Sequence, residues 1–328
     1  MELITREHLA HILMLQEIFK SIIIMKKTRF ILTILLALNF NTCLRLDDFL
    51  FNQQKIQSYK LDNYTGDREL ANLPASYDIA SNLIYGPFTI TSKSEKNQNV
   101  TIYAIYIGDT TLISNGIQKV ILYCHGNRDH MDFYWPRAKL LANVGAKNKY
   151  GVLMIDYQGY GMSEGTPSEA GMYNDVDAAI GWLFNQGLTA NNLIIYGYSL
   201  GSAPATELTA HPRTMQPSLI MLEAPFASAE TMAQDATLLA LPGSYFMNIK
   251  INNADNMRII YKPFLWMHGI NDSFLSITTH GEMVYANYAG TSSQAIRVSG
   301  SVHNNLPEVY GYSNYTLVLD QFILNNLP

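Results

Sequence analysis

Hydrophobic residues from about residue 80 onward fall into short, unbroken runs that polar stretches separate. The most apolar runs cover residues 119–124, 151–155, 193–196, 219–222 and 264–267. Short apolar runs without alternation are typical of strands in a parallel sheet that is covered on both faces. Residues 84–91 and 100–107 are rich in β-branched and aromatic residues and indicate an antiparallel pair of strands. Residues 295–299 complete the predicted sheet.

Helical patterns alternate with these runs. Apolar residues recur at spacings of three and four over residues 168–185, which predicts an amphipathic helix there. Further helices are predicted over residues 202–210, 277–288 and 307–324. This alternation predicts an α/β domain over residues 76–328, with a mostly parallel, doubly wound sheet and helices on both faces.

The N-terminal region is patterned differently. A basic stretch from Met25 to Arg29 precedes an apolar run over residues 30–38. This is the layout of a secretory signal, and the run is too short to span a bilayer as a helix. We expect translation to start at Met25 and residues 1–24 to be an upstream extension. An amphipathic helix that belongs to the folded domain is the alternative.

Cys43 follows the apolar run, as the lipidated cysteine does in bacterial lipoprotein signals, although Thr42 stands where such signals carry a small residue. The resemblance implies an exported envelope protein that is attached to a membrane through a lipid on Cys43. A cleaved soluble signal and an uncleaved anchor are the alternatives. Residues 1–43 are thus the extension plus signal. Residues 44–75, which are polar and without a period, are interpreted as a tether.

Composition narrows the classes of protein. The chain has 328 residues, of which 48% are hydrophobic, so it can bury a core. Its net charge is −5 and it has no long basic run, which argues against nucleic acid as a partner. Two cysteines, Cys43 and Cys124, exclude a disulfide scaffold, and Cys124 reads as a core residue. No metal or cofactor is expected, because the histidines and carboxylates lack the spacing of metal ligands.

The sequence Gly197-Tyr198-Ser199-Leu200-Gly201 follows a predicted strand and precedes an alanine-rich helix. That context is typical of a nucleophile elbow, a turn so sharp that its central residue takes up strained backbone angles. Gly197 and Gly201 must lack side chains so that the strand and the helix can pass closely. Ser199 is therefore the candidate nucleophile.

A serine hydroxyl needs a base, and in enzymes with this elbow an acid and then a histidine follow later in the chain. His303 lies in a loop between the last predicted strand and the final helix, at the same sheet edge as Ser199, and is the candidate base. His211 lies beyond the far end of the elbow helix and His280 within a helix, so both are interpreted as structural.

The candidate acid is Asp272, in the loop after the strand that ends near residue 267. Its rival is Glu223, which closes the preceding strand; we interpret Glu223 as a buried carboxylate that binds loop backbone. His268 and Gly269 are interpreted as a packing and turn element.

Six segments together resemble α/β-hydrolases of the serine-aminopeptidase-like superfamily, in particular the small-lidded Bem46 type. They cover residues 123–127, 156–165, 197–201, 223–226, 268–272 and 303–304. The resemblance implies the α/β-hydrolase fold and an oxyanion hole made by the backbone N–H groups of Asn127 and Leu200. The chain departs from the family pattern at Arg128-Asp129-His130, where a glycine and an asparagine are usual, and His130 is not expected to be catalytic.

A small cap is expected between the strands that end near residue 223 and begin near residue 263, where this fold inserts its lids. Its apolar candidates are Met232, Leu238, Leu239, Leu241, Tyr245, Phe246 and Met247. Such a cap favours an acyl chain over a polymer or a charged ligand. Packing of these residues on the sheet edge is the alternative.

The sequence thus predicts a serine hydrolase that cleaves small carboxylic esters or thioesters through an acyl-enzyme. A peptidase of the serine-aminopeptidase type is the second hypothesis. The third hypothesis is a catalytically silent, surface-anchored binding protein on the same scaffold. The complete set of Ser199, Asp272 and His303 argues against it.

Overall fold

A computed structural model of the chain describes residues 50–237 and 248–327. They belong to a compact unit that runs from Asp47 to Pro328. The predicted signal with Cys43, and the cap candidates from Leu238 to Met247, lie outside the described residues. Among the helices of the described part, none is long and apolar enough to cross a membrane.

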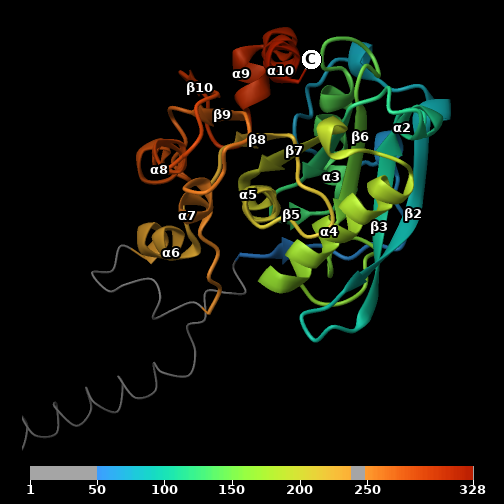
Figure 1. The fold of residues 1–328 in the computed structure, drawn as a ribbon, viewed down its shortest axis with the longest axis horizontal. Coiled ribbons are helices and arrows are strands. Elements are labelled where there is room, and N and C mark those ends of the chain that lie inside the picture. The colour runs from blue at the N-terminus through green and yellow to red at the C-terminus, as the bar shows by residue number, and fades with distance from the viewer. Residues whose placement is uncertain (1–49, 238–247, 328) are drawn as a thin grey trace, which may run out of the picture. The chain divides into compact units, whose positions relative to one another are not determined.

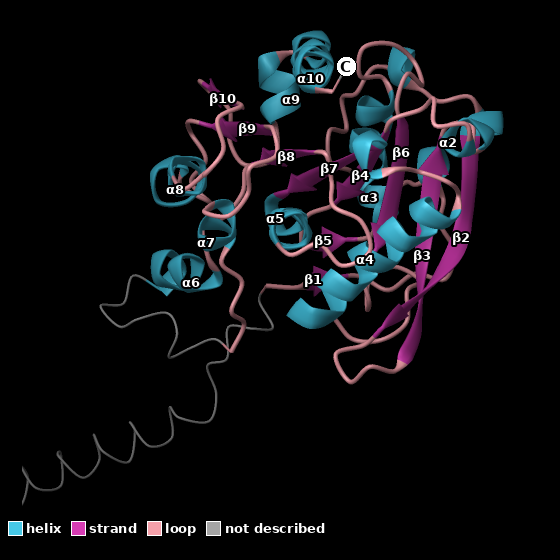
Figure 2. Cartoon of the chain, viewed as in Figure 1, coloured by secondary structure: helices cyan, strands magenta, loops and turns pink. Residues whose placement is uncertain are grey.

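A central sheet of eight strands forms the frame of the domain (Figures 1 and 2). Its order is β10-β9-β8-β7-β4-β6-β3-β2. The strands are β2 (Ile84–Lys93), β3 (Asn99–Ile107), β4 (Val120–Cys124), β6 (Gly151–Asp156), β7 (Leu193–Tyr198), β8 (Leu219–Glu223), β9 (Phe264–Gly269) and β10 (Ser293–Val298). Neighbours from β10 to β6 pair in parallel, whereas β3 is antiparallel to both β6 and β2. The predicted mostly parallel sheet is confirmed.

Helices cover both faces of this sheet, as the unbroken apolar strands predict. They are α2 (Thr111–Ser114), α3 (Met131–Ala142), α4 (Glu169–Asn185), α5 (Ser202–Ala210), α6 (Ala229–Thr237), α7 (Asn253–Met257), α8 (Glu282–Ala286), α9 (Leu306–Tyr310) and α10 (Tyr312–Asn326). Within β7, Ile195 packs in a core cluster with α4 and α5, while Ile194 and Tyr196 pack in a second cluster with α3 and α10. Successive side chains of one strand therefore supply two separate cores.

Two predicted helices are interrupted in the structure. The one expected over residues 277–288 begins with a π-helical turn, Ile277–Gly281, before α8. The one expected over residues 307–324 is split into α9 and α10 at Gly311, whose φ of +88° no helix accommodates.

Helix α3 had no counterpart among the predicted helices. All of its twelve residues are buried, including Asp132, Arg137 and Lys139, and Pro136 lies inside it. A helix that is buried all round has no polar face, so its sequence lacks the apolar stripe on which periodicity depends.

The prediction of a tether over residues 44–75 is wrong for its described part. Strand β1 (Asn52–Gln53) pairs in parallel with β5 (Arg128–Asp129), next to the loop that follows β4. Leu50 and Leu70 are buried in the two core clusters. No sequence pattern indicates this attachment, because isolated apolar residues and backbone pairing leave no period.

Polar contacts fix the same segment to α3. The carboxylate of Asp132 accepts hydrogen bonds from the backbone N–H groups of Lys60, at 3.0 Å, and Leu61, at 2.7 Å. Glu69 forms a two-pronged ion pair with Arg137, with N···O distances of 2.7 and 2.9 Å. Residues 50–75 are therefore a part of the domain.

Candidate active site

The turn after β7 places Ser199 at the carboxyl edge of the sheet. Ser199 has a φ of +51°, a left-handed conformation that residues other than glycine rarely adopt. A single turn, Ser199–Gly201, leads directly into α5, and the Ser202 hydroxyl donates to the Ser199 carbonyl at 2.6 Å. Strain of this kind is held by its surroundings and is found most often at functional sites.

The two flanking glycines permit this turn. A Cβ at Gly197 would lie 2.6 Å from the carbonyl oxygen of Gly201, and a Cβ at Gly201 would lie 2.0 Å from that of Cys124. Real Cβ atoms do not approach backbone oxygens so closely. Strand β4, strand β7 and helix α5 can therefore pack at this distance only with glycine at both positions.

We expect Gly201→Ala to lower the free energy of unfolding by about 1–3 kcal/mol, because the methyl group overpacks a rigid backbone contact. The matched control is Gly181→Ala in α4, where a Cβ meets nothing within 4 Å. That change should stabilise the protein by roughly 0.5–1 kcal/mol, since alanine suits a helix better than glycine. Urea unfolding of the two variants measures both values, and equal effects would contradict the close approach.

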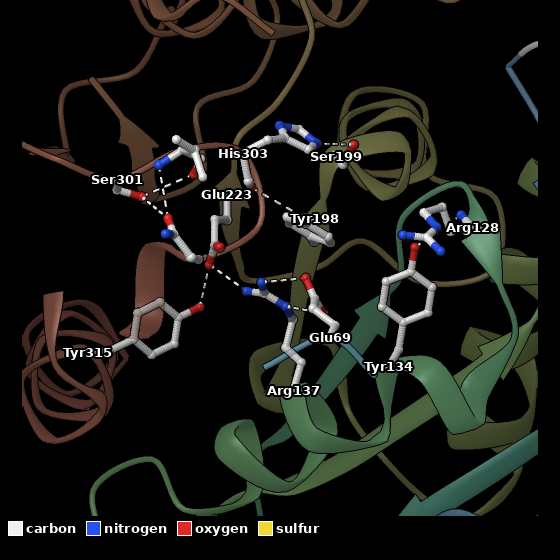
Figure 3. A network of polar contacts seen from close by, with 12 residues as sticks. Glu69, Arg128, Tyr134, Arg137, Tyr198, Ser199, Glu223, Ser301, His303 and Tyr315 are labelled. Carbon is white, nitrogen blue, oxygen red and sulfur yellow. Dashed lines mark hydrogen bonds and ion pairs between the residues drawn. The ribbon is translucent and has the colours of Figure 1, made fainter. Parts of the chain in front are cut away.

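Ser199, His303 and Asp272 converge from three loops at the same sheet edge. The His303 Nε2 lies 2.9 Å from the Ser199 Oγ, and its Nδ1 lies 2.7 Å from the Asp272 Oδ2 (Figure 3 shows His303 and Ser199). Ser199 follows β7, Asp272 follows β9 and His303 follows β10. The ring of Phe274, 4.9 Å from that of His303, and the Tyr198 hydroxyl, which donates to the His303 carbonyl, hold the histidine in place.

Asp272 is buried and accepts several hydrogen bonds. Its Oδ1 accepts from the backbone N–H groups of Phe274 and Leu275, each at 2.9 Å. Burial alone would raise the pKa of this carboxyl, but hydrogen bonds from His268 and His303 outweigh it and hold the pKa well below its ordinary value. Asp272 is therefore a carboxylate at neutral pH, with its orientation fixed.

A cavity of about 280 Å³ opens over Ser199. Four aromatic residues contribute to its wall, Phe133, Tyr134, Tyr198 and Phe274, beside polar side chains that include Glu69 and Arg128. Gly126 and Asn127 also line it, on the loop after β4. The cavity thus presents more apolar than polar surface.

Asn127 and Leu200, the predicted oxyanion donors, lie on two different segments near Ser199: Asn127 lines the cavity, and Leu200 follows Ser199 in the chain. The Gly126 carbonyl accepts from the His125 Nδ1 at 2.7 Å. In a trans peptide the N–H points opposite to the C=O, so this bond fixes the direction of the Asn127 N–H. Leu200 is the residue after Ser199, in the first turn of the elbow helix, where N–H groups have no partner within the helix.

The histidines interpreted as structural lie in other contacts. His280 is buried and its Nδ1 accepts from the Ala227 N–H. His130 caps α3 through the Asp132 N–H, and His211 is the exposed C-cap of α5. No contact joins them to Ser199 in the described part of the chain.

Glu223, the rival candidate for the acid, has no hydrogen bond to His303. The prediction that it binds loop backbone is wrong. It binds side chains and not loop backbone: its Oε2 accepts from Arg137 at 2.7 Å, from the Tyr196 hydroxyl at 2.6 Å and from the Tyr315 hydroxyl at 2.7 Å. These donors come from α3, β7 and α10, far apart in the sequence.

A buried ion cluster below Ser199 escaped the sequence analysis (Figure 3). Arg137 is fully buried between Glu69 and Glu223, and its guanidinium lies 4.1 Å from the ring centre of Tyr198. Tyr198 immediately precedes the nucleophile candidate. The cluster thus packs against the residue that precedes Ser199 and supports the elbow. No local sequence motif predicts it.

Among the described residues, no three or more His, Cys, Asp or Glu side chains are arranged to hold a metal ion. Cys124 is buried at the end of β4, and burial raises the pKa of its thiol, which suits a core residue.

The sheet order, the elbow after β7 and the loops after β9 and β10 define the α/β-hydrolase fold. Solved structures of this fold align with the chain. The esterase Pf2001 of Pyrococcus furiosus aligns with a TM-score of 0.59 at 16% identity, over 84% of this chain and 100% of that one. The esterase RhEst1 from Rhodococcus sp. ECU1013 aligns with a TM-score of 0.54 at 16% identity, over 73% of this chain and 99% of that one.

Sequence comparisons agree with the fold. Residues 116–263 match the family model described as serine aminopeptidase, S33. Alpha/beta hydrolase domain-containing protein 17C of Xenopus tropicalis is 28% identical over 216 residues, 66% of this chain and 64% of that protein. The human protein of the same name is 28% identical over 209 residues, 63% of this chain and 59% of that protein. The match thus spans less than two thirds of the relatives' length.

The structural likenesses show the α/β-hydrolase fold, and the sequence matches, which cover only part of the chain, agree with it. The narrower Bem46-type resemblance stays a prediction.

Proposed function

We propose that the protein is a serine hydrolase that cleaves carboxylic esters or thioesters through an acyl-enzyme. The observation that carries the proposal is the chain of contacts from the Ser199 Oγ through both nitrogens of His303 to the Asp272 carboxylate, at the rim of a cavity. A serine becomes nucleophilic when a histidine so oriented can accept its proton.

In the proposed reaction Ser199 attacks the substrate carbonyl while the His303 Nε2 takes the hydroxyl proton. Asp272, which accepts from the Nδ1, keeps the imidazole in the required tautomer and stabilises its cation. The N–H groups of Asn127 and Leu200 bind the developing oxyanion. The His303 proton then passes to the leaving alcohol or thiol, and a water molecule hydrolyses the acyl-enzyme by the same steps.

The cavity wall supports a small acyl group as the part of the substrate bound beside Ser199. Its rings offer apolar surface, and the solved structures of similar fold include esterases. Attachment to a membrane through a lipid on Cys43 is a separate proposal about residues outside the described part.

The second candidate, a peptidase, is favoured by the match to the S33 family model. An aminopeptidase must hold the free amine of its substrate, for which a carboxylate is needed. Glu69 lines the cavity, but both of its carboxylate oxygens already bind Arg137. Because the charge of Glu69 is already balanced by the buried guanidinium, it offers a substrate amine less than an unpaired carboxylate would, and we prefer the esterase proposal.

Labelling with a fluorophosphonate tests the proposal. The wild type should be labelled and should hydrolyse short-chain p-nitrophenyl esters, and Ser199→Ala should do neither, because the probe reacts with an activated serine. The same preparations assayed with aminoacyl anilides separate the two candidates. A folded wild type that neither reacts with the probe nor turns over esters refutes the proposal.

A further inference from the structure

A second histidine contacts the carboxylate of Asp272. His268 lies in β9, four residues before Asp272, and is fully buried. Its Nε2 lies 2.9 Å from the Leu275 carbonyl oxygen and 3.2 Å from the Asp272 Oδ2. Both neighbours are acceptors, so the Nε2 must carry a proton that it shares between them.

The other side of the same ring has no polar partner. The Nδ1 of His268 is buried and accepts or donates no hydrogen bond within the described residues. A Cβ at Gly281 would lie 2.3 Å from this nitrogen, so the backbone of the turn before α8 packs directly against the imidazole. An imidazolium needs an acceptor at both nitrogens. The geometry therefore places a proton on the Nε2, whereas the Nδ1 has no acceptor within the described residues.

We propose that His268 is a positioning residue that fixes the Asp272 carboxylate for its contact with His303. This inference rests on the proposed function and adds a fourth side chain to it. His303 and His268 donate to the Oδ2, while the N–H groups of Phe274 and Leu275 donate to the Oδ1. With donors on both oxygens the carboxylate cannot rotate away from His303.

A positioning role for His268 requires a hydrogen-bond donor at a fixed place, which a packing role does not. A core residue at this position would need only volume and apolar surface. Here the Nε2–H must lie within reach of two acceptors, the Leu275 carbonyl and the Asp272 carboxylate. The backbone of Gly281 packs against the other side of the ring, so the imidazole cannot move away from them. Misplacement of a catalytic group by about 1 Å can cost roughly 100-fold in rate, so the contact matters to turnover.

Two amide variants separate these readings. In His268→Gln the side-chain nitrogen can reach the position of the Nε2, whereas in His268→Asn it reaches only that of the Nδ1. We expect His268→Asn to lower kcat for a short-chain ester by roughly 10- to 100-fold and to change KM much less, because the carboxylate loses its orientation. His268→Gln should keep most of the wild-type kcat. Equal losses in two folded variants would overturn the proposal.

Each variant is then combined with Asp272→Asn. If His268 acts through Asp272, His268→Asn costs little further rate once the carboxylate is gone, since residues that act as a unit are not additive. Full additivity would assign His268 a role in packing alone.

A measurement on the wild type needs no change at position 268. With 15N-labelled histidine, the His268 proton should be found on the Nε2, and its NMR shift should move in Asp272→Asn. A proton on the Nδ1, or an unmoved shift, overturns the inference. These results do not depend on turnover, so failure of the inference is distinguishable from failure of the esterase proposal, for which fluorophosphonate labelling decides.

Discussion

Replacement of His303 by alanine should lower kcat for ester hydrolysis by roughly 10⁴- to 10⁶-fold, because Ser199 then has no group to accept its proton. The imidazole bridges the Ser199 Oγ and the Asp272 Oδ2, at 2.9 and 2.7 Å, and no other histidine in the described part contacts the serine. The His303 side chain is partly exposed, so its removal should leave the fold intact.

The matched control is His211→Ala, which removes an exposed histidine at the end of the elbow helix and should leave kcat unchanged. The double variant Ser199→Ala/His303→Ala should be no slower than either single variant, because the pair acts as a unit. Single-turnover and steady-state assays on protein checked by circular dichroism give these values. A loss of less than about tenfold would remove His303 from the proposed mechanism.

Arg137→Met should destabilise the domain by about 3–5 kcal/mol, because it leaves two carboxylates buried without their shared cation. Arg137 and Glu223 are both fully buried, and Glu69 is 3% exposed. Glu223 has no access to water, and Glu69 reaches it only at the wall of the cavity. Urea unfolding at neutral pH measures the loss.

The control for this change is Arg258→Met. Arg258 pairs with Asp255 on the surface, with both side chains more than 60% exposed. Its loss should change the free energy of unfolding by no more than about 0.5 kcal/mol. If both arginine variants cost the same, the buried cluster contributes no more than a surface pair.

The sheet could be predicted because β4, β6, β7, β8 and β9 are buried on both faces, which leaves unbroken apolar runs in the sequence. The convergence of Ser199, Asp272 and His303 follows from the same reasoning. Parallel strands end at one edge, so residues just after β7, β9 and β10 are brought together although 31 and 104 residues separate the bonded pairs. Their chemical roles remain predictions.

The supports of the site could not be predicted in this way. Glu69 stands in a stretch without a period, and Arg137 in a helix that is buried all round. Their pairing depends on a contact across 68 residues that no local pattern encodes. The sequence indicates only a packing and turn element at His268, because a motif shows which residues are adjacent in sequence but not which nitrogen faces a carboxylate.

The attachment of residues 50–75 to the domain affects how the chain folds during its synthesis on the ribosome. These residues leave the exit tunnel early, yet Asn52 binds the Asn127 carbonyl and Asn72 binds Glu308, far later in the chain. Leu50 and Leu70 therefore cannot complete their packing until the strands and helices of the two core clusters have been synthesised. Late closure of this kind slows folding and prolongs the interval in which a chaperone could bind the nascent chain.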